Sequence, residues 1–236
     1  MTFGFLRQYW KTIIICGLIL IAHLLVQVEG MKTTTATNTA WLITTIPIFI
    51  VILSYIFLRE RISRWQLLGM VVAATGVLIL VSRGNLGSLD FIKSYGDWMV
   101  LASCGTWTIY TVLGKRITGQ NPLAIIMLVS SVVAIILIPP VIFRSGIDIY
   151  FALPGRVLYA LLFLGVFCQG IAYWIWLEGL KRKSAGQVGT FLYLEPLSTM
   201  AAAPFILGES ITPSLIGGGI LVVIGVWLVQ LKKTAP

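Results

Sequence analysis

Glu195 is the acidic residue of this 236-residue sequence whose setting is most suggestive of chemistry. It lies about ten residues inside the apolar stretch 185–207, and no basic residue is near it in the sequence. A charge in such a stretch costs a few kcal/mol or more unless it faces a cavity, has a polar partner or takes up a proton. We therefore consider two roles for Glu195: contact with a substrate amine or carriage of a proton, and a purely structural hydrogen bond.

Polar and aromatic residues recur elsewhere at the i, i+4, i+7 spacing of a single helix face. One set is Gln169, Tyr173 and Trp176, and the other is Ser103, Trp107 and Tyr110. Such faces could line a cavity and stack on aromatic or cationic substrates. They could equally be helix-packing surfaces or part of an interfacial aromatic belt.

Two further polar residues lie within apolar stretches. His23 is in the middle of the first stretch, where it could bind substrate, although a lone histidine is more often a packing and hydrogen-bonding residue. Asn38 and Gln187 occupy corresponding positions near the starts of two stretches, where they could cap a helix or line a pore. The candidate substrate-binding residues are therefore Glu195, Gln169, Tyr173, Trp107, Tyr110, His23 and Asn38.

No enzyme motif accompanies these residues. The chain has one histidine, and its three cysteines, Cys16, Cys104 and Cys168, lie in separate apolar stretches without a CxxC spacing. This pattern argues against a metal site and against a disulfide framework. The sequence also lacks a Ser-His-Asp set, a phosphate loop and a nucleotide fingerprint. We expect a protein that is not an enzyme, needs no cofactor or metal, and cannot be driven by ATP.

The composition indicates that these residues are carried by a membrane protein. Hydrophobic residues make up 58% of the chain and charged residues 11%, and the mean hydropathy is +0.97. A soluble domain carries roughly 25% charged residues, because its surface needs polar cover. The net charge of +9 does not indicate nucleic-acid binding, because the basic residues lie in short loops between apolar stretches.

Eight apolar stretches have the length of about 20 residues that a helix needs to cross the hydrocarbon core. They are roughly residues 12–29, 37–58, 65–83, 96–114, 122–143, 157–178, 185–207 and 213–231. Their continuous, non-alternating character favours helices over a β-barrel. The sequence therefore predicts an all-α, polytopic membrane protein with about eight transmembrane helices. A signal peptide at residues 1–30 is the alternative for the first stretch, but its apolar core is long and contains His23 and Gln27.

The basic residues predict the orientation of these helices. With eight crossings, twelve of the seventeen lie at one set of ends and five at the other. The twelve are Arg7, Lys11, Arg59, Arg61, Arg64, Lys115, Arg116, Lys181, Arg182, Lys183, Lys232 and Lys233. Because basic loops stay in the cytoplasm, we expect a multi-pass protein of the inner membrane with both termini cytoplasmic.

An internal repeat relates two parts of the chain at one constant offset of 149 residues. The matched pairs are Glu29-Gly30 with Glu178-Gly179, Ala36 with Ala185, Pro47 with Pro196, Leu58, Glu60 and Ile62 with Leu207, Glu209 and Ile211, Gly69 with Gly218, and Gly76-Val77 with Gly225-Val226. Chance similarity between apolar segments does not readily align two glutamates, a proline and three glycines without a gap. The chain therefore contains two copies of one structural unit.

The repeat predicts the organisation of the chain. Five helix starts separate a segment from its copy, and an odd number reverses the direction of crossing, as in the inverted repeats of many secondary transporters. We expect residues 1–83 to form a first half-repeat of three helices, 84–95 a loop, and 96–236 a second half-repeat of five. Counterparts of residues 96–143 would precede Met1, so we expect the first half-repeat to lack two helices.

These motifs resemble those of the drug/metabolite transporter superfamily and its EamA-type permeases. The resemblance rests on the first copy (Pro47, Leu58-Arg59-Glu60-Arg61-Ile62, Leu68-Gly69, Gly76), on the second copy (Glu195-Pro196, Leu207-Gly208-Glu209, Gly217-Gly218, Gly225), and on Gly96-Asp97 followed by Trp107-Thr108-Ile109-Tyr110. It implies two inverted five-helix halves that move amino acids, metabolites or drugs. The departure from the pattern is the absent first pair of helices, because the first helix of the family helps to line the central cavity.

The repeated residues have structural interpretations. Pro47 and Pro196 should kink their helices by removing a backbone hydrogen bond. Gly69, Gly76, Gly218 and Gly225 should let helices approach closely. We expect Glu60 and Glu209 to bind local partners, such as a loop cation or backbone amides.

The function that follows is secondary transport of a small metabolite, amino acid or drug-like compound by alternating access, with possible proton coupling through Glu195. Its partners would be membrane lipid and a small-molecule substrate, together with a second copy of the chain or another protein that supplies the missing helices. The alternative is a truncated membrane paralogue that does not transport, or an assembly partner.

Overall fold

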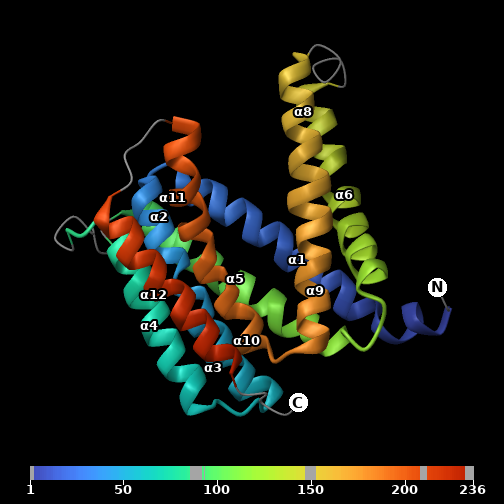
Figure 1. Ribbon diagram of the computed structural model, residues 1–236. Coiled ribbons are helices and arrows are strands. Elements are labelled where there is room, and N and C mark those ends of the chain that lie inside the picture. Colours follow the sequence, from blue (N-terminus) through green and yellow to red (C-terminus); the bar gives the residue numbers. More distant parts are fainter. Residues whose placement is uncertain (1–2, 86–91, 93, 147–152, 208–211, 232–236) are drawn as a thin grey trace. The chain divides into compact units, whose positions relative to one another are not determined.

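The computed structural model describes residues 3–85, 92, 94–146, 153–207 and 212–231, and these residues form helices joined by short connections. The helices are α1 (Phe3–Met31), α2 (Ala36–Ile43), α3 (Ile46–Leu58), α4 (Arg64–Val81), α5 (Tyr95–Ile117), α6 (Pro122–Ser145), α8 (Gly155–Phe163), η2 (Leu164–Ile171), α9 (Ala172–Arg182), α10 (Ala185–Gly189), η3 (Thr190–Tyr193), α11 (Leu194–Leu207) and α12 (Pro213–Gln230) (Figure 1). Each of the eight predicted stretches is helical, and the all-α prediction is confirmed.

The helical segments have the length and surface of membrane spans. Among the described residues, six are long and apolar enough to cross a bilayer: Arg7–Met31, Asn38–Leu58, Arg64–Val81, Pro122–Arg144, Gly155–Arg182 and Pro213–Gln230. The predicted stretches 96–114 and 185–207 are also helical, although the second is divided into α10, η3 and α11. Large apolar side chains such as Phe143, which is 94% exposed, lie on the surface, where lipid rather than water suits them. The protein is thus a polytopic membrane protein.

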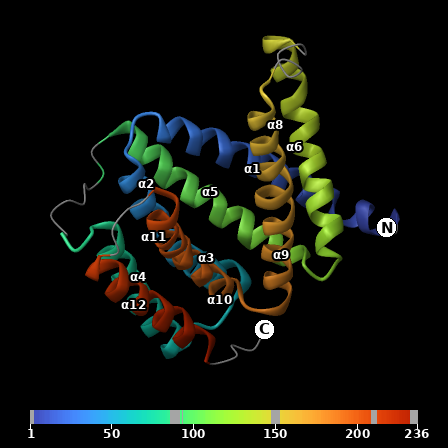
Figure 2. The ribbon, with the colours of Figure 1, turned by 45° about the horizontal axis from the view of Figure 1, so that its top comes forward.

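The chain forms two compact units, which we describe separately. The first comprises residues 1–21 and 113–182, and the second residues 22–112 and 183–236. In the first unit, α6 runs beside the α8–η2–α9 segment (Figures 1 and 2). The middle of α1 packs closely on α6, because a Cβ atom at Gly17 would lie 2.6 Å from Cγ1 of Val132. The middle of the long segment, η2, is π-helical, a geometry that is often found at functional sites.

The second unit is organised around the contact between α4 and α12, which lie side by side in both views (Figures 1 and 2). A Cβ atom at Gly76 would lie 2.7 Å from the carbonyl oxygen of Gly218, and one at Gly69 would lie 2.5 Å from that of Gly225. The repeat matches Gly69 with Gly218 and Gly76 with Gly225, so the contacts are crossed. Two antiparallel copies related by a two-fold axis produce this crossed pairing.

Apolar side chains from both helices fill the rest of this interface. The buried cluster consists of Ala73, Val77, Leu80, Tyr193, Val222 and Val226. Tyr193 comes from η3, at the interruption that precedes α11, and its side chain is completely buried. The α4–α12 contact thereby also holds the segment that carries Glu195.

Both helices that contain a repeated proline are interrupted just before it. Helix α2 ends at Ile43 and α3 begins at Ile46, with Pro47 in its first turn. In the second copy, η3 ends at Tyr193 and α11 begins at Leu194, with Pro196 in its first turn. Proline is tolerated in a first turn, because the amide it lacks would have no intrahelical partner there. The first copy is thus interrupted by the two-residue turn Thr44–Thr45, and the second by the 3-10 segment η3.

Glu60, in the connection between α3 and α4, bonds to the distant start of α10. Its carboxylate accepts hydrogen bonds from the backbone amides of Ala185 at 2.9 Å and Gly186 at 3.5 Å, at the start of α10. These amides have no intrahelical partner, so an acceptor from another segment satisfies them. The backbone-amide partner agrees with our expectation, but it is 125 residues away instead of local. Glu209, the repeat counterpart of Glu60, lies outside the described residues.

The crossed glycine contact predicts a large difference between two alanine substitutions. Gly76→Ala should lower the free energy of unfolding by about 1–3 kcal/mol, because its methyl group would meet the backbone of α12. Gly217→Ala is the matched control, because a Cβ atom there meets nothing within 4 Å. Thermal unfolding of both variants in detergent, followed by circular dichroism, measures the difference. Equal midpoints would contradict the close helix contact.

The Glu60 bridge predicts a second difference. Glu60→Ala should cost about 1–3 kcal/mol, because it leaves two helix-end amides without their charged acceptor. Glu29→Ala is the control, since Glu29 makes an exposed ion pair with Lys32, of a kind that contributes about 0–1 kcal/mol. The same unfolding assay compares them, and a Glu60→Ala variant as stable as Glu29→Ala would show that the bridge is unimportant.

Candidate functional site

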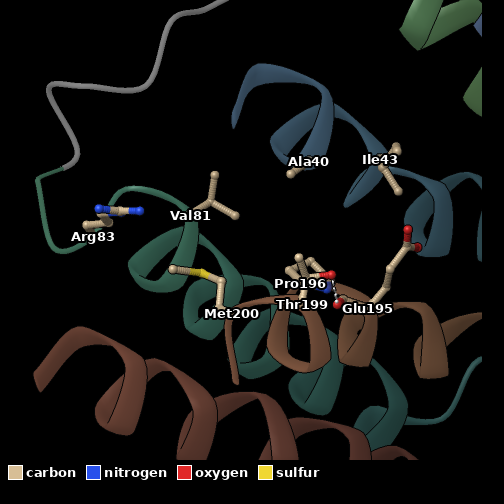
Figure 3. Close-up of a pocket in the computed structure, with 8 residues that line it drawn as sticks. All are labelled: Ala40, Ile43, Val81, Arg83, Glu195, Pro196, Thr199 and Met200. Atoms are coloured by element: carbon tan, nitrogen blue, oxygen red, sulfur yellow. Dashed lines mark hydrogen bonds between the residues drawn. The ribbon is translucent and has the colours of Figure 1, made fainter. Parts of the chain in front are cut away.

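A cavity of about 240 Å³ lies between the interrupted segments α2–α3 and η3–α11, within the second unit. Helix α2 forms one side, α11 forms the other, and the end of α4 closes it (Figure 3). Its lining residues are Ala40, Ile43, Val81, Arg83, Glu195, Pro196, Thr199 and Met200. The cavity therefore lies beside both interruptions, because α2 ends at the first and α11 begins at the second.

Glu195 is the acidic residue of this cavity. Its side chain extends from the first turn of α11 toward α2 (Figure 3). The carboxylate makes no hydrogen bond or ion pair with the residues that the structure describes, although its backbone carbonyl accepts bonds from Ser198 and Thr199. A carboxylate that faces a cavity without a protein partner can bind an ammonium group or a proton.

Arg83 lies at the other end of the cavity from Glu195 (Figure 3). It follows Ser82, the C-cap residue of α4, and has a left-handed conformation with a φ of 51°. Hydrogen bonds from Arg83 N to Leu80 O at 3.1 Å and from Gly84 N to Ile79 O at 3.1 Å form a Schellman turn. This turn ends α4 and positions Arg83 beside the cavity.

Three of the predicted binding residues come together between α1 and α5. His23 Nδ1 donates to the carbonyl oxygen of Ser103 at 3.0 Å, and the His23 ring lies 5.3 Å from that of Trp107. The Trp107 ring lies 5.5 Å from that of Tyr110. His23 and Tyr110 are buried, with 6% and 1% of their surface exposed. The cluster is a packed polar and aromatic contact between two helices, and its contact with a substrate stays a prediction.

Asn38 belongs to a hydrogen-bond network around Asp97. The Asn38 side-chain amide and the Thr34 hydroxyl both donate to Oδ1 of Asp97. Asp97 and Ser94 also form a reciprocal capping box at the start of α5, with bonds of 2.8 and 3.1 Å. Asn38 thus connects the start of α2 to the start of α5, and a pore-lining role for it is untested.

Gln169 and Tyr173 lie in the first unit, on η2 and α9. Both are half-buried, and the Gln169 side chain hydrogen-bonds that of Tyr173 one turn later. This contact places the two side chains on the same side of the segment, and a shared face with Trp176 stays a prediction. Their role in substrate binding stays a prediction.

Several cavity residues were not among the sequence candidates. Arg83 had a detectable signal, because it is one of the five basic residues on the predicted non-cytoplasmic side and ends the apolar stretch 65–83. No such signal marked the apolar lining residues Ala40, Ile43, Val81 and Met200. The sequence of an apolar stretch does not distinguish residues that face lipid, core or cavity.

Comparison with known proteins identifies the family. The model of the EamA-like transporter family matches residues 3–82 and 94–231. An uncharacterized transporter of Archaeoglobus fulgidus is 27% identical over 88% of this chain and 71% of its own length. The Bacillus subtilis protein named uncharacterized transporter YyaM is 29% identical over 84% of this chain and 65% of its own length.

Two other matches bear on function and on fold. A Salmonella typhimurium protein named as a probable amino-acid metabolite efflux pump is 27% identical over 72% of this chain and 58% of its own length. A chain in a solved crystal structure is 20% identical with a TM-score of 0.78, and the match covers 95% of this chain and 78% of that one. This likeness concerns the fold alone.

The aligned parts span 58% to 71% of the length of these three curated relatives. The family model nevertheless covers most of the chain, from the start of α1 to the end of α12. It also agrees with the resemblance found in the repeated prolines, glutamates and glycines. This chain belongs to the EamA-like transporter family.

Proposed function

We propose that the protein is a secondary transporter that moves a small metabolite, amino acid or drug-like molecule across the inner membrane. The observation that carries the proposal is the cavity between the interrupted helices of the two half-repeats, into which the Glu195 carboxylate extends. Interrupted helices at a repeat interface are where transporters of this architecture bind their substrates. The names of the relatives support the same assignment.

Transport would occur by alternating access. The crossed contact of Gly69 with Gly225 and of Gly76 with Gly218 supports a pseudo-two-fold relation between α4 and α12. Two similar halves related in this way can form two similar arrangements that open to opposite sides of the membrane. The driving force would be an ion gradient or the substrate's own gradient.

Coupling to protons would use Glu195. An ionised carboxylate with an apolar neighbour such as Ile43 is unstable unless a cation neutralises it. A proton and a substrate ammonium group would then compete for the same carboxylate. Competition of this kind produces exchange, in which entry of a proton on one side accompanies release of substrate on the other.

Replacement of Glu195 tests the coupling. In proteoliposomes with an imposed pH gradient, radiolabelled primary amines and amino acids serve as probes, and a pH-sensitive dye reports proton movement. Wild-type protein should show proton flux on addition of a transported probe, whereas Glu195→Gln should lose the dependence on the gradient. Glu178→Gln is the control, because Glu178 makes an i,i+4 ion pair with Arg182 outside the cavity. Coupled flux that persists in Glu195→Gln would refute the coupling role.

The orientation is tested by labelling single cysteines in the full-length protein. Lys32→Cys should react with a membrane-impermeant maleimide on intact cells, because the α1–α2 connection should face outward and the Lys32 side chain is 61% exposed. Arg61→Cys, in the α3–α4 connection, should react only after the cells are broken. The reverse pattern would place both termini on the outside.

A further inference from the structure

The cavity carries opposite charges at its two ends. Glu195 extends from α11 at one end, and Arg83 lies at the other end, where α4 stops (Figure 3). Val81 and Met200 lie between the two in the same view. The two charges therefore lie at separate points of the cavity.

The wall between these points is mainly apolar. Ala40 and Ile43 of α2 lie opposite α11, and Val81 and Met200 complete the apolar lining (Figure 3). The Thr199 hydroxyl donates to the backbone oxygen of Glu195 at 3.0 Å, so its proton is already engaged. A ligand that extends along this wall needs an apolar middle, because it finds little there to hydrogen-bond.

The position of Arg83 is built into the end of α4. The Schellman turn places residue 83 at the site of the left-handed residue, which is most often glycine. An arginine there adopts a conformation that side-chain-bearing residues rarely take, and its side chain reaches the cavity. Strained backbone positions of this kind are concentrated at functional sites.

We propose that the cavity selects elongated amphoteric molecules, with an ammonium group at Glu195, a carboxylate at Arg83 and an apolar chain between them. Arg83 is then the residue that determines specificity. A guanidinium binds a carboxylate through two parallel hydrogen bonds and repels an ammonium group. A diamine is thus disfavoured at one end and a diacid at the other. An α-amino acid, whose two charges share one carbon, reaches only one end. This inference rests on the proposed substrate site at Glu195.

The test is a binding series with the purified full-length protein in lipid nanodiscs. The probes are ω-amino carboxylic acids with three to nine methylene groups, the n-alkylamines and α,ω-diamines of matching length, and leucine. Affinity in the ω-amino acid series should pass through an optimum length. At that length we expect the amino acid to bind about tenfold more tightly than the alkylamine, and the diamine to bind more weakly than either.

Three variants separate the contributions of the two ends. Arg83→Gln should abolish the roughly tenfold margin of the amino acid over the alkylamine, while the alkylamine affinity stays within about threefold of wild type. Glu195→Gln should weaken the binding of amines and amino acids alike. Arg156→Gln is the matched control, because Arg156 is exposed at the start of α8 and does not line the cavity.

The outcomes distinguish failure of the inference from failure of the proposed site. If alkylamines bind through Glu195 but Arg83→Gln keeps the margin, the role of Arg83 is overturned and the site stands. Leucine that binds as tightly as the best ω-amino acid, with no effect of Arg83→Gln, would overturn the elongated ligand class. If no probe shows binding that depends on Glu195, both the site and the inference fail.

Discussion

The close backbone contact between α4 and α12 is the constraint on which the second unit depends. In lipid there is little hydrophobic drive for two helices to associate, so their contact relies on close packing of small residues. Gly69 and Gly76 supply that contact from α4, and Gly218 and Gly225 supply it from α12, in crossed pairs. The crossed pairing relates the two copies by an approximate two-fold axis. Tyr193, buried in the same interface, holds the interruption before α11 against it, so the cavity depends on this contact as well.

The carboxylates of Asp97, Glu60 and Glu195 differ mainly in whether other protein groups donate hydrogen bonds to them. Asp97 accepts bonds from Thr34, Asn38 and Ser94, and Glu60 accepts two backbone amides at the start of α10. Both stabilise helix ends whose backbone groups would otherwise lack partners in a low-dielectric medium. Glu195 makes no such bond with the described residues and extends into the cavity. This contrast is the physical basis for assigning structural roles to the first two and a binding role to the third.

Sequence reasoning located the helices well and the contacts between them less well. The eight apolar stretches correspond to the helical segments, and the repeated glycines were expected at helix contacts. The offset could not show that Gly69 meets Gly225 instead of its own counterpart Gly218, because that depends on how the two copies face each other. His23, Trp107 and Tyr110 were separate candidates, and their contact appeared only in three dimensions. Arg83 was not among the candidate binding residues.

The sequence alone determined the membrane environment, the helical class, the internal repeat and the family. These properties depend on hydropathy, length and spacing along the chain, which do not require knowledge of distant contacts. Only the tertiary structure decided which residues surround Glu195 and that Arg83 lies at the opposite end of the same cavity. Arg83 and Glu195 are 112 positions apart in the sequence, and packing among α2, α4 and α11 brings them to one cavity. No local pattern encodes that arrangement. In the sequence Glu195 is an isolated acidic residue. In the structure it lies at one end of a cavity that has Arg83 at the other end.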